Sequence, residues 1–398
     1  MSSRFQCRSC QGESGQLVLD LGEQPLANNL MREEDLARPE PRFPLRLLVC
    51  QSCWLMQLGE LVPPVRLFAD YPYFSSVSQT FREHVAAAAG RYLAEFRLGA
   101  GHGVMEIASN DGCFLEHFRA AGVPALGIEP AANVAAVARA RGIETVVEFF
   151  GQALANRLKD EGRQADLVLG NNVFAHAPEI NDFVAGLETV LKPGGRIILE
   201  FPYAVDFLRH TEFDTIYHEH VYYFALTPLV PLFRRHGLEI FAVERLSIHG
   251  GSLRLFAGRA GEHGLNDSVS RMLEAEREEG LERPEAYAAF AAKARELRTA
   301  LVSLLGQLKA QGKRIAAYGA SAKGSTLLNF CGLGRETLEF IADRSIHKQG
   351  KYAPGTKLPI VAVEELESRR PDYAVLLTWN FAQEILAQQQ AYRARGGR

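Results

Sequence analysis

The chain has 398 residues, of which 47% are hydrophobic and 23% are charged, and its formal net charge is -3. These values are typical of a soluble globular protein with two or three domains. The negative net charge argues against nucleic-acid binding, because nucleic-acid-binding proteins usually carry a basic excess. No apolar run approaches the roughly 20 residues that cross a bilayer, and the first residues lack the apolar core of a signal peptide. We therefore expect a cytoplasmic protein with no membrane partner, whose six cysteines are thiols or metal ligands.

Two C-x2-C pairs lie near the start of the chain, Cys7 with Cys10 and Cys50 with Cys53. Two such turns facing each other give the tetrahedral all-sulfur coordination that suits Zn²⁺. Four protein ligands leave no open position, so we expect a structural zinc ion in a domain that covers residues 1–70. Four unrelated thiols are the alternative interpretation. The segment between the pairs is too long for a compact nucleic-acid zinc ribbon.

Residues 71–79, YPYFSSVSQ, precede an amphipathic helical pattern, TFREHVAAAAGRYLAEFRL. Tyr71 and Tyr73 either belong to a binding site or cap a hydrophobic core, and the sequence leaves both interpretations open. We assign Tyr73 to substrate binding.

From about residue 101, short apolar strands alternate with helices. The predicted strands are VMEI, ALGIE, TVVEF, ADLVLGNN and RIILEF, with an Ala-rich helix from 131 and a turn at LKPGG. This pattern predicts a doubly wound α/β sheet, in which ligands bind at the carboxyl ends of the strands.

The turns after these strands indicate which nucleotide binds. The first turn lacks G-x-G-x-x-G, which disfavours NAD. Glu129 ends the second strand, where a carboxylate accepts hydrogen bonds from both ribose hydroxyls. Together these features predict S-adenosylmethionine (SAM) as the cofactor, bound by Glu106, Ala108, Asn110, Glu129, Glu148, Phe149 and Asn171.

The chain resembles the class I SAM-dependent methyltransferases, and over nearly its full length the sugar C-methyltransferases that act on nucleotide-linked keto-deoxysugars. The resemblance rests on the four-cysteine domain and on LFADYPYFSSVS, EIASNDG, NNVFAH, YHEHVYYF and YGASAKG. It implies a Rossmann-like methyltransferase core, a zinc domain before it and a second Rossmann-like domain after it. The family turn usually has glycine where this chain has Ala108. If that position requires a positive φ, alanine weakens SAM binding.

The stretch DTIYHEHVYYF, residues 214–224, lies in a loop after the fifth strand. Methylation of a carbon next to a ketone needs a base, a group that polarises it and donors for the enolate oxygen. The resemblance implies that His220 is the base and that Glu219 is its partner or a substrate ligand. It also implies that Tyr217, His176 and Tyr71 line the sugar pocket.

Two other interpretations of this stretch remain open. One is a metal site made by His218, His220 and His176, since H-x-H binds metals. The other is a purely structural cluster whose polar groups satisfy one another.

The last third begins with a charged helical region, 266–311, and continues with strand, glycine turn and helix in GKRIAAYGASAKGSTLLNF. Ser321 and Lys323 lie where the helix begins, which favours an anion. With the strands LEFIADR and DYAVLLTWN, this region predicts a small Rossmann-like unit that binds the nucleotide diphosphate. A degenerate domain kept for packing is the alternative. We place the SAM domain at 71–265 and this domain at 266–398.

The expected function is therefore SAM-dependent C3-methylation of a nucleotide-linked 4-keto-deoxysugar, with dTDP as the expected nucleotide, in deoxysugar biosynthesis. O- or N-methylation of a small molecule and a non-catalytic zinc- and nucleotide-binding module are the alternatives. A monomer and a homodimer are both compatible with the sequence.

Overall fold

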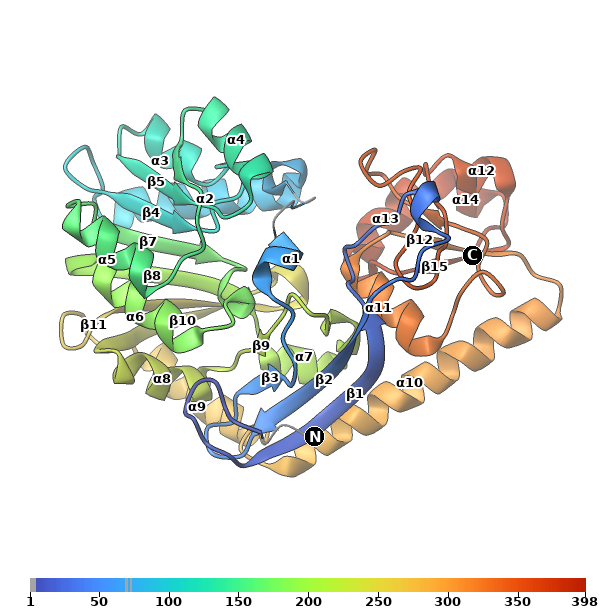
Figure 1. The fold of residues 1–398 in the computed structure, drawn as a ribbon, viewed down its shortest axis with the longest axis horizontal. Coiled ribbons are helices and arrows are strands. Elements are labelled where there is room, and N and C mark those ends of the chain that lie inside the picture. The colour runs from blue at the N-terminus through green and yellow to red at the C-terminus, as the bar shows by residue number, and fades with distance from the viewer. Residues whose placement is uncertain (1–4, 69–70, 72–73) are drawn as a thin grey trace.

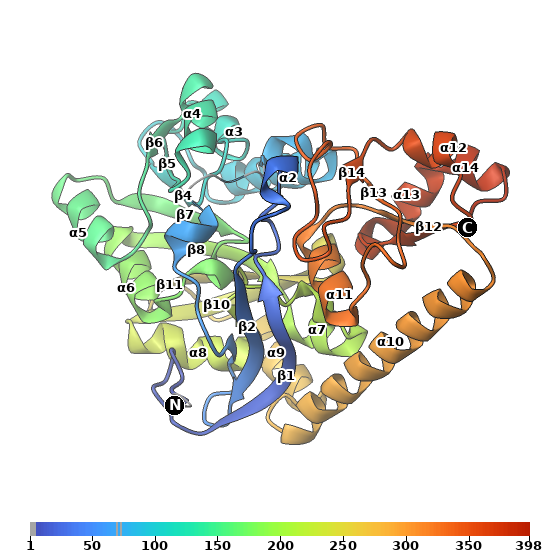
Figure 2. The ribbon, with the colours of Figure 1, turned by 45° about the vertical axis from the view of Figure 1, so that its right-hand side comes forward.

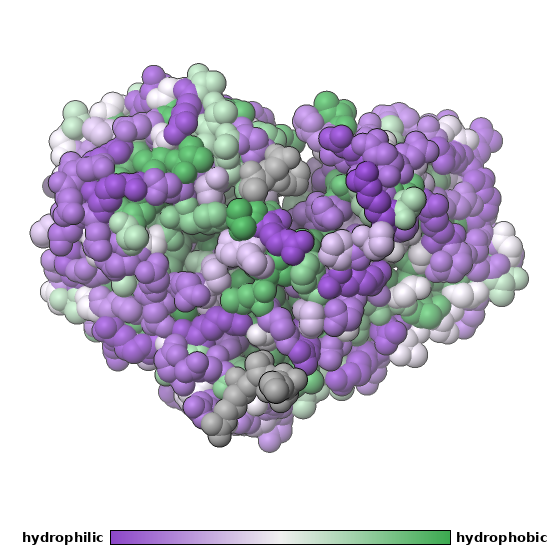
Figure 3. Space-filling model, viewed as in Figure 1, coloured by the Kyte–Doolittle hydropathy of each residue, from purple (hydrophilic) through white to green (hydrophobic). Residues whose placement is uncertain are grey.

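The computed structural model describes residues 5–68, 71 and 74–398. Figure 1 shows two α/β lobes that are joined by one long helix and bridged by an N-terminal hairpin. The outline of the space-filling view is indented between the lobes (Figure 3). Among the described residues, no helix is both long enough and apolar enough to cross a membrane.

The central lobe contains a seven-stranded sheet in the order β10-β11-β8-β7-β4-β5-β6. Its strands are β4 (Val104–Ile107), β5 (Ala125–Ile128), β6 (Glu144–Val146), β7 (Ala165–Asn171), β8 (Leu191–Pro202), β10 (Leu238–Leu246) and β11 (Ser252–Arg259). Strands β4 to β8 are parallel, whereas β11 is antiparallel to both of its neighbours. The strand order reverses between β4 and β7, so the ligand crevice is expected at the carboxyl ends of these two strands.

Alternating side chains of the strands bury both faces of this sheet. Leu167 and Leu169 of β7 pack in one cluster with α2 (Gln79–Glu95) and α3 (Leu115–Ala120). Val168 packs in another cluster with α5 and α6, as the period of two in a strand requires. The other helices of this lobe are α4 (Ala132–Ala140), α5 (Gln152–Asp160), α6 (Ile180–Val190), α7 (Ala204–His210), α8 (Leu226–Arg235) and α9 (Asp267–Glu278).

The C-terminal lobe is a smaller parallel sheet in the order β14-β13-β12-β15. Its strands are β12 (Ile315–Tyr318), β13 (Ile341–Ala342), β14 (Ile360–Val361) and β15 (Tyr373–Leu376). Its helices are α11 (Ala322–Cys331), α12 (Glu365–Arg369), α13 (Ala382–Gln388) and α14 (Gln390–Ala394). Helix α10 (Pro284–Ala310) runs along the edge of the molecule to this lobe (Figure 1).

The N-terminal region is a long antiparallel hairpin of β1 (Gly15–Pro25) and β2 (Arg42–Cys50), followed by β3 (Met56–Leu58) and the short helix α1 (Pro64–Phe68). Its sheet has the order β1-β2-β3-β9, and β9 (Tyr222–Tyr223) comes from the active-site stretch of the central lobe. The zinc region is therefore not a self-contained unit, and Figure 2 shows its hairpin in front of the junction of the two lobes. The boundaries of the three domains stay a prediction.

One local prediction was wrong. LKPGG, expected as a turn, lies inside β8, where Gly194 takes the positive φ of 71°.

Candidate active site

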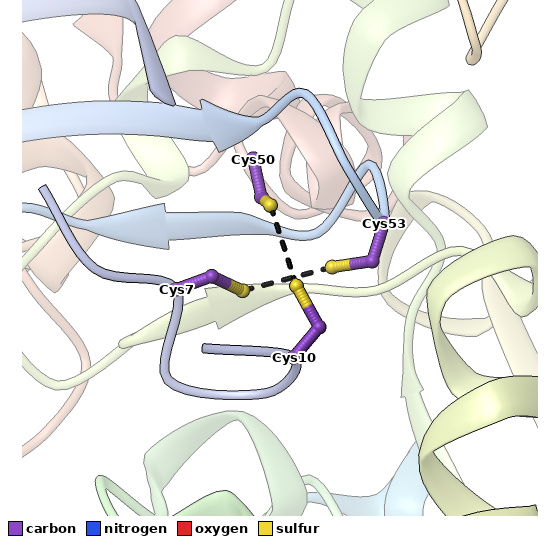
Figure 4. Close-up of side chains that lie close together, drawn as sticks. All are labelled: Cys7, Cys10, Cys50 and Cys53. Atoms are coloured by element: carbon purple, nitrogen blue, oxygen red, sulfur yellow. Dashed lines mark hydrogen bonds between the residues drawn. The ribbon is translucent and has the colours of Figure 1, made fainter. Parts of the chain in front are cut away.

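Four cysteine thiols meet at the base of the hairpin (Figure 4). All four Sγ atoms lie within 4.8 Å of one another, and the Cys7–Cys53 and Cys10–Cys50 sulfur pairs are each 3.6 Å apart. A zinc ion with Zn–S bonds of about 2.3 Å places its tetrahedral sulfurs about 3.8 Å apart. The cluster therefore fits Zn²⁺ with little rearrangement.

The charge of the cluster also favours a cation. The hydrogen bond with Cys53 lowers the pKa of Cys7 to about 5, while that contact and burial raise the pKa of Cys53. Burial and the charge of Cys7 also raise the pKa of Cys10, because like charges repel in a buried site. A divalent ion removes this penalty and lets all four sulfurs ionise.

The cofactor turn connects β4 to α3. The Asn110 N–H donates to Oε2 of Glu129, and the Ala131 N–H donates to its Oε1, both at 2.9 Å. The end of β5 thus holds the turn that follows β4. Each carboxylate oxygen keeps a second lone pair for a ligand hydroxyl, as the ribose prediction for Glu129 requires.

Three buried acids surround this turn, Glu106, Asp111 and Glu129. Burial raises the pKa of Glu106 well above its ordinary value, and the charges of Glu129 and Asp111 raise it further. One Glu106 oxygen is buried with no partner among the described residues, and so is the amide nitrogen of Asn171 at the end of β7. SAM carries an ammonium and a sulfonium, so a ligand of its charge fits this acidic cradle.

The turn uses left-handed backbone conformations at non-glycine residues. Ala108 has φ of 55° and Asn110 has φ of 50°. Asparagine tolerates this region, whereas an alanine there costs about 1–2 kcal/mol. The position at which the resemblance expects glycine therefore does require a positive φ.

The two adenine candidates lie at the rim. Phe149 is 48% exposed, which leaves its ring open for stacking. Glu148 is also exposed and pairs with Arg157. Both follow β6, two strands away from β4.

A segment before α2 lies on the cofactor turn, and no pattern in the sequence indicates this contact. The Ser75 N–H donates to Oδ1 of Asn110 at 2.9 Å, and the Ser76 N–H donates to Oδ2 of Asp111 at 3.3 Å. Arg141 bridges the two by donating to the Ser76 hydroxyl and to the Asp111 carbonyl. The segment before α2 is thus tied to the turn between β4 and α3.

Tyr71 lies in the same segment, where Asn133 of α4 holds its backbone. The Tyr71 N–H donates to Oδ1 of Asn133, and the Tyr71 carbonyl accepts from its Nδ2 at 2.8 Å. The ring of Phe68 contacts both Tyr71 and His176, with centroids 5.7 and 5.5 Å apart. The Phe68 ring therefore lies between Tyr71 and His176, whereas Tyr73 falls outside the described residues.

The active-site stretch makes a turn that brings Tyr217 onto His220. The His220 N–H donates to the Tyr217 carbonyl, and the Tyr217 hydroxyl lies 2.7 Å from Nε2 of His220. Nδ1 of His220 lies 3.0 Å from the Thr215 carbonyl, which only accepts. Nδ1 therefore carries the proton, and Nε2 presents a lone pair to the Tyr217 hydroxyl. The polariser of His220 is thus the Thr215 carbonyl, not Glu219.

His176 completes the cluster from the 3-10 helix Phe174–His176. Its ring packs edge-on against His220, with centroids 5.0 Å apart, and its Nδ1 is buried without a partner among the described residues. Burial lowers the pKa of His176 to about 4, and burial together with His176 lowers that of His220 well below 6.5. Both histidines are therefore neutral at physiological pH.

The metal interpretation of this cluster was wrong. His218 turns away from the other two histidines, with Nε2 3.3 Å from the Pro44 carbonyl and its ring against Phe43. Among the described residues, the four cysteines are the group of three or more ligands that is close enough for a metal ion.

The C-terminal lobe reaches this loop through α11. The Lys323 ammonium lies 4.8 Å from the centre of the Trp379 ring, and Trp379 donates to Asp214 at 2.7 Å. The charge of Lys323 opposes the rise that burial causes in the pKa values of Glu212 and Asp214. Ser321 instead caps α11 by accepting from the Gly324 N–H at 3.1 Å.

Comparison with known proteins assigns the chain to a family. Three family models match in succession: "Putative zinc binding domain" over residues 7–68, "Methyltransferase domain" over 79–243 and "C-methyltransferase C-terminal domain" over 247–398. C-methyltransferase NovU from Streptomyces niveus is 38% identical over 394 residues, which are 99% of this chain and 94% of that protein. The chain belongs to the C-methyltransferase family. It is a SAM-dependent methyltransferase with a class I core and an N-terminal zinc-binding domain, which confirms the predicted fold class, cofactors and enzyme class.

Other similarities cover less of the chain. A ubiquinone biosynthesis O-methyltransferase from Chelativorans sp. (strain BNC1) is 30% identical over 115 residues, which are 29% of this chain and 46% of that protein. The crystal structure of magnesium protoporphyrin IX methyltransferase from Synechocystis PCC 6803 with bound SAM has a TM-score of 0.35 and 16% identity. The aligned region covers 45% of this chain and 79% of the magnesium protoporphyrin IX methyltransferase chain.

The four-cysteine cluster predicts the metal content of the protein. Purified protein should contain about one zinc ion per chain, and Cys53→Ser should lose it and unfold at lower denaturant concentration, because three ligands close the site poorly. Elemental analysis and denaturant titration measure both effects. Cys331→Ser, at a buried cysteine outside the cluster, is the control that should keep its zinc. Full zinc content in Cys53→Ser would contradict the assignment.

The positive φ of Ala108 predicts that a glycine at this position increases both the stability of the protein and its affinity for SAM. Ala108→Gly should raise the free energy of unfolding by about 1 kcal/mol and tighten SAM binding several-fold, because glycine adopts this conformation without strain. Denaturant titration and calorimetric SAM titration measure the two effects. Ala121→Gly, at an exposed position with φ of -82°, should instead be destabilising. Equal losses in both variants would show that Ala108 carries no strain.

Proposed function

We propose that the enzyme methylates carbon C3 of a nucleotide-linked 4-keto-deoxysugar, with His220 as the base. The observation that carries this proposal is the Thr215–His220–Tyr217 hydrogen-bonded chain, which fixes the tautomer and leaves Nε2 as the basic atom. Membership of the C-methyltransferase family favours a carbon acid over a hydroxyl or amine substrate.

The first step is a proton transfer. The C3–H bond breaks, its electron pair stays on the sugar as an enolate, and the proton goes to Nε2 of His220. The low pKa of His220 keeps it neutral and ready to accept a proton. The Thr215 carbonyl accepts from Nδ1–H and stabilises the imidazolium that forms.

Two groups are suited to hold the enolate oxygen. Burial raises the pKa of Tyr217 well above 10, so its hydroxyl stays protonated and can turn from Nε2 to the substrate. Nδ1 of His176 is buried without a partner among the described residues, and in the Nδ1–H tautomer, in which Nε2 carries no proton, it would donate to the ketone oxygen.

The cofactor would be held by the acidic cradle at the ends of β4 and β5. When bound, SAM supplies an electrophilic methyl group to the site. Glu106 and Glu129 would balance its positive charge, and Asn110 with Ser75 would keep the cofactor turn in position. Glu219 is left as a substrate ligand, because the Thr215 carbonyl already orients His220.

The base assignment has a direct test with a matched control. Purified protein with SAM and a panel of nucleotide-linked 4-keto-6-deoxysugars should give products heavier by one methylene in mass spectra. His220→Asn should abolish this product and keep SAM affinity, since no cofactor residue changes. His218→Asn, two residues away and turned toward Pro44, should retain methyl transfer. Full activity of His220→Asn would refute the assignment, and product from hydroxyl or amine substrates alone would favour O- or N-methylation.

The C-terminal lobe is proposed to bind the nucleotide diphosphate through Lys323. Within the described residues no carboxylate lies within salt-bridge distance of its ammonium, and its charge reaches His220. Ser321 contributes less in this proposal, because its hydroxyl caps the helix and Asp343 already accepts from the adjacent Ala320 N–H at 2.7 Å.

Lys323→Ala should weaken the binding of a nucleoside diphosphate roughly tenfold, because a cation is lost from the proposed phosphate site. Calorimetric titration with dTDP measures this change. Lys309→Ala, at an exposed residue in the last turn of α10, is the control that should bind like the wild type. Unchanged affinity in Lys323→Ala would leave the C-terminal lobe as a packing domain.

A further inference from the structure

The tip of the N-terminal hairpin, residues 26–41, reaches the C-terminal lobe. The backbones of Met31 and Tyr352 exchange two hydrogen bonds of 3.0 and 2.9 Å. The Gly355 N–H donates to Glu40 at 2.7 Å, and the Lys357 ammonium donates to the Leu36 carbonyl at 2.6 Å. These contacts fix the tip in the junction between the two lobes.

One side chain of this tip enters the active site. Nδ2 of Asn28 donates to Oε1 of Glu219 at 2.7 Å, across 191 positions of sequence. Glu219 is only 4% exposed. The hydrogen bond therefore joins the zinc-binding region to a buried carboxylate that is adjacent in sequence to the base His220.

Glu219 depends on this donor for its charge. Burial raises its pKa to about 7, and the Asn28 hydrogen bond is the interaction that opposes this rise. The Glu219 charge acts on Tyr217 of the same turn, and His176 of the 3-10 helix lies against the Glu219 backbone. Neither is charged near neutral pH, because burial raises the pKa of Tyr217 and lowers that of His176 to about 4.

We propose that Asn28 is a positioning residue, which holds the Glu219 carboxylate ionised and oriented to accept a hydroxyl of the bound sugar. The inference rests on the proposed function, in which Glu219 is a substrate ligand. An N–H donor stabilises a carboxylate more than a carboxylic acid, and an ionised carboxylate accepts a stronger hydrogen bond from a sugar hydroxyl. The zinc-binding region thus contributes a side chain to the active site.

Asn28→Ala should raise KM for the sugar about tenfold at pH 7 with little change in kcat or in SAM affinity. Its KM should approach that of the wild type as pH rises, because the carboxyl ionises again above its raised pKa. Loss of packing alone would not depend on pH in this way. Asn29→Ala, at the exposed neighbouring asparagine, is the control that should behave like the wild type.

A second variant separates the hydrogen bond from the fold. Asn28→Asp keeps the shape but replaces the donor by a second carboxyl, so the pair shares a proton and KM should rise at least as much. If Asn28→Ala loses zinc or unfolds, the KM of Asn28→Asp tests the positioning role instead. A KM within twofold of the wild type in Asn28→Asp across the pH range overturns the proposal.

Infrared spectroscopy tests the same inference without substrate. The carboxylic-acid band of Glu219, identified by its loss in Glu219→Gln, should persist to a pH about one unit higher in Asn28→Ala than in the wild type. If no sugar is methylated but this band shifts, the proposed function fails and the Asn28 contact stands. If sugars are methylated and the band does not move, the positioning role fails alone.

Discussion

The pairing of β3 with β9 is the constraint on which the active site depends. Met56 and Gln57 of the N-terminal region pair with Tyr223 and Tyr222, which directly follow the turn that carries His220. The Val221 N–H in turn donates to the Ala175 carbonyl beside His176. Two catalytic candidates from distant parts of the chain are therefore fixed by one strand of two residues. Without the N-terminal sheet this strand has no partner on that side, and the Tyr217–His220 turn loses its support.

The two halves of the candidate site differ in charge: one gathers acidic groups and the other contains neutral histidines. Burial shifts the pKa values in both halves. On the cofactor side, Glu106, Asp111 and Glu129 collect negative charge whose repulsion a cationic ligand relieves. On the other side, burial lowers the pKa values of His176 and His220, so that both imidazoles are neutral before the proposed proton transfer. Because Tyr217 and the Thr215 carbonyl satisfy both nitrogens of His220, this neutral base is buried without an orphaned polar atom.

Local patterns in the sequence were sufficient to predict individual strands and the residues that lie next to them. VMEI is β4 from its first residue to its last, and the two C-x2-C pairs meet as their spacing predicts. Contacts between distant segments left no such signal. Asn28 has no periodic pattern around it that indicates Glu219, and Ser75 and Ser76 bond to Asn110 and Asp111 through backbone N–H groups that any residue possesses. Proximity in sequence also misled: Glu219 is next to His220, yet the Thr215 carbonyl orients that histidine.

The hairpin connects the four-cysteine cluster to the candidate active site. At about 3.3 Å per residue, the 11 residues of β1 would span roughly 35 Å, and the bulges near Leu17 and Asp20 bend and shorten the strand. The cysteine cluster and Asn28 therefore lie at opposite ends of one rigid element. Zinc bound by the four cysteines would hold the base of the hairpin, the Met31–Tyr352 pairing holds its tip, and Asn28 of this tip reaches Glu219.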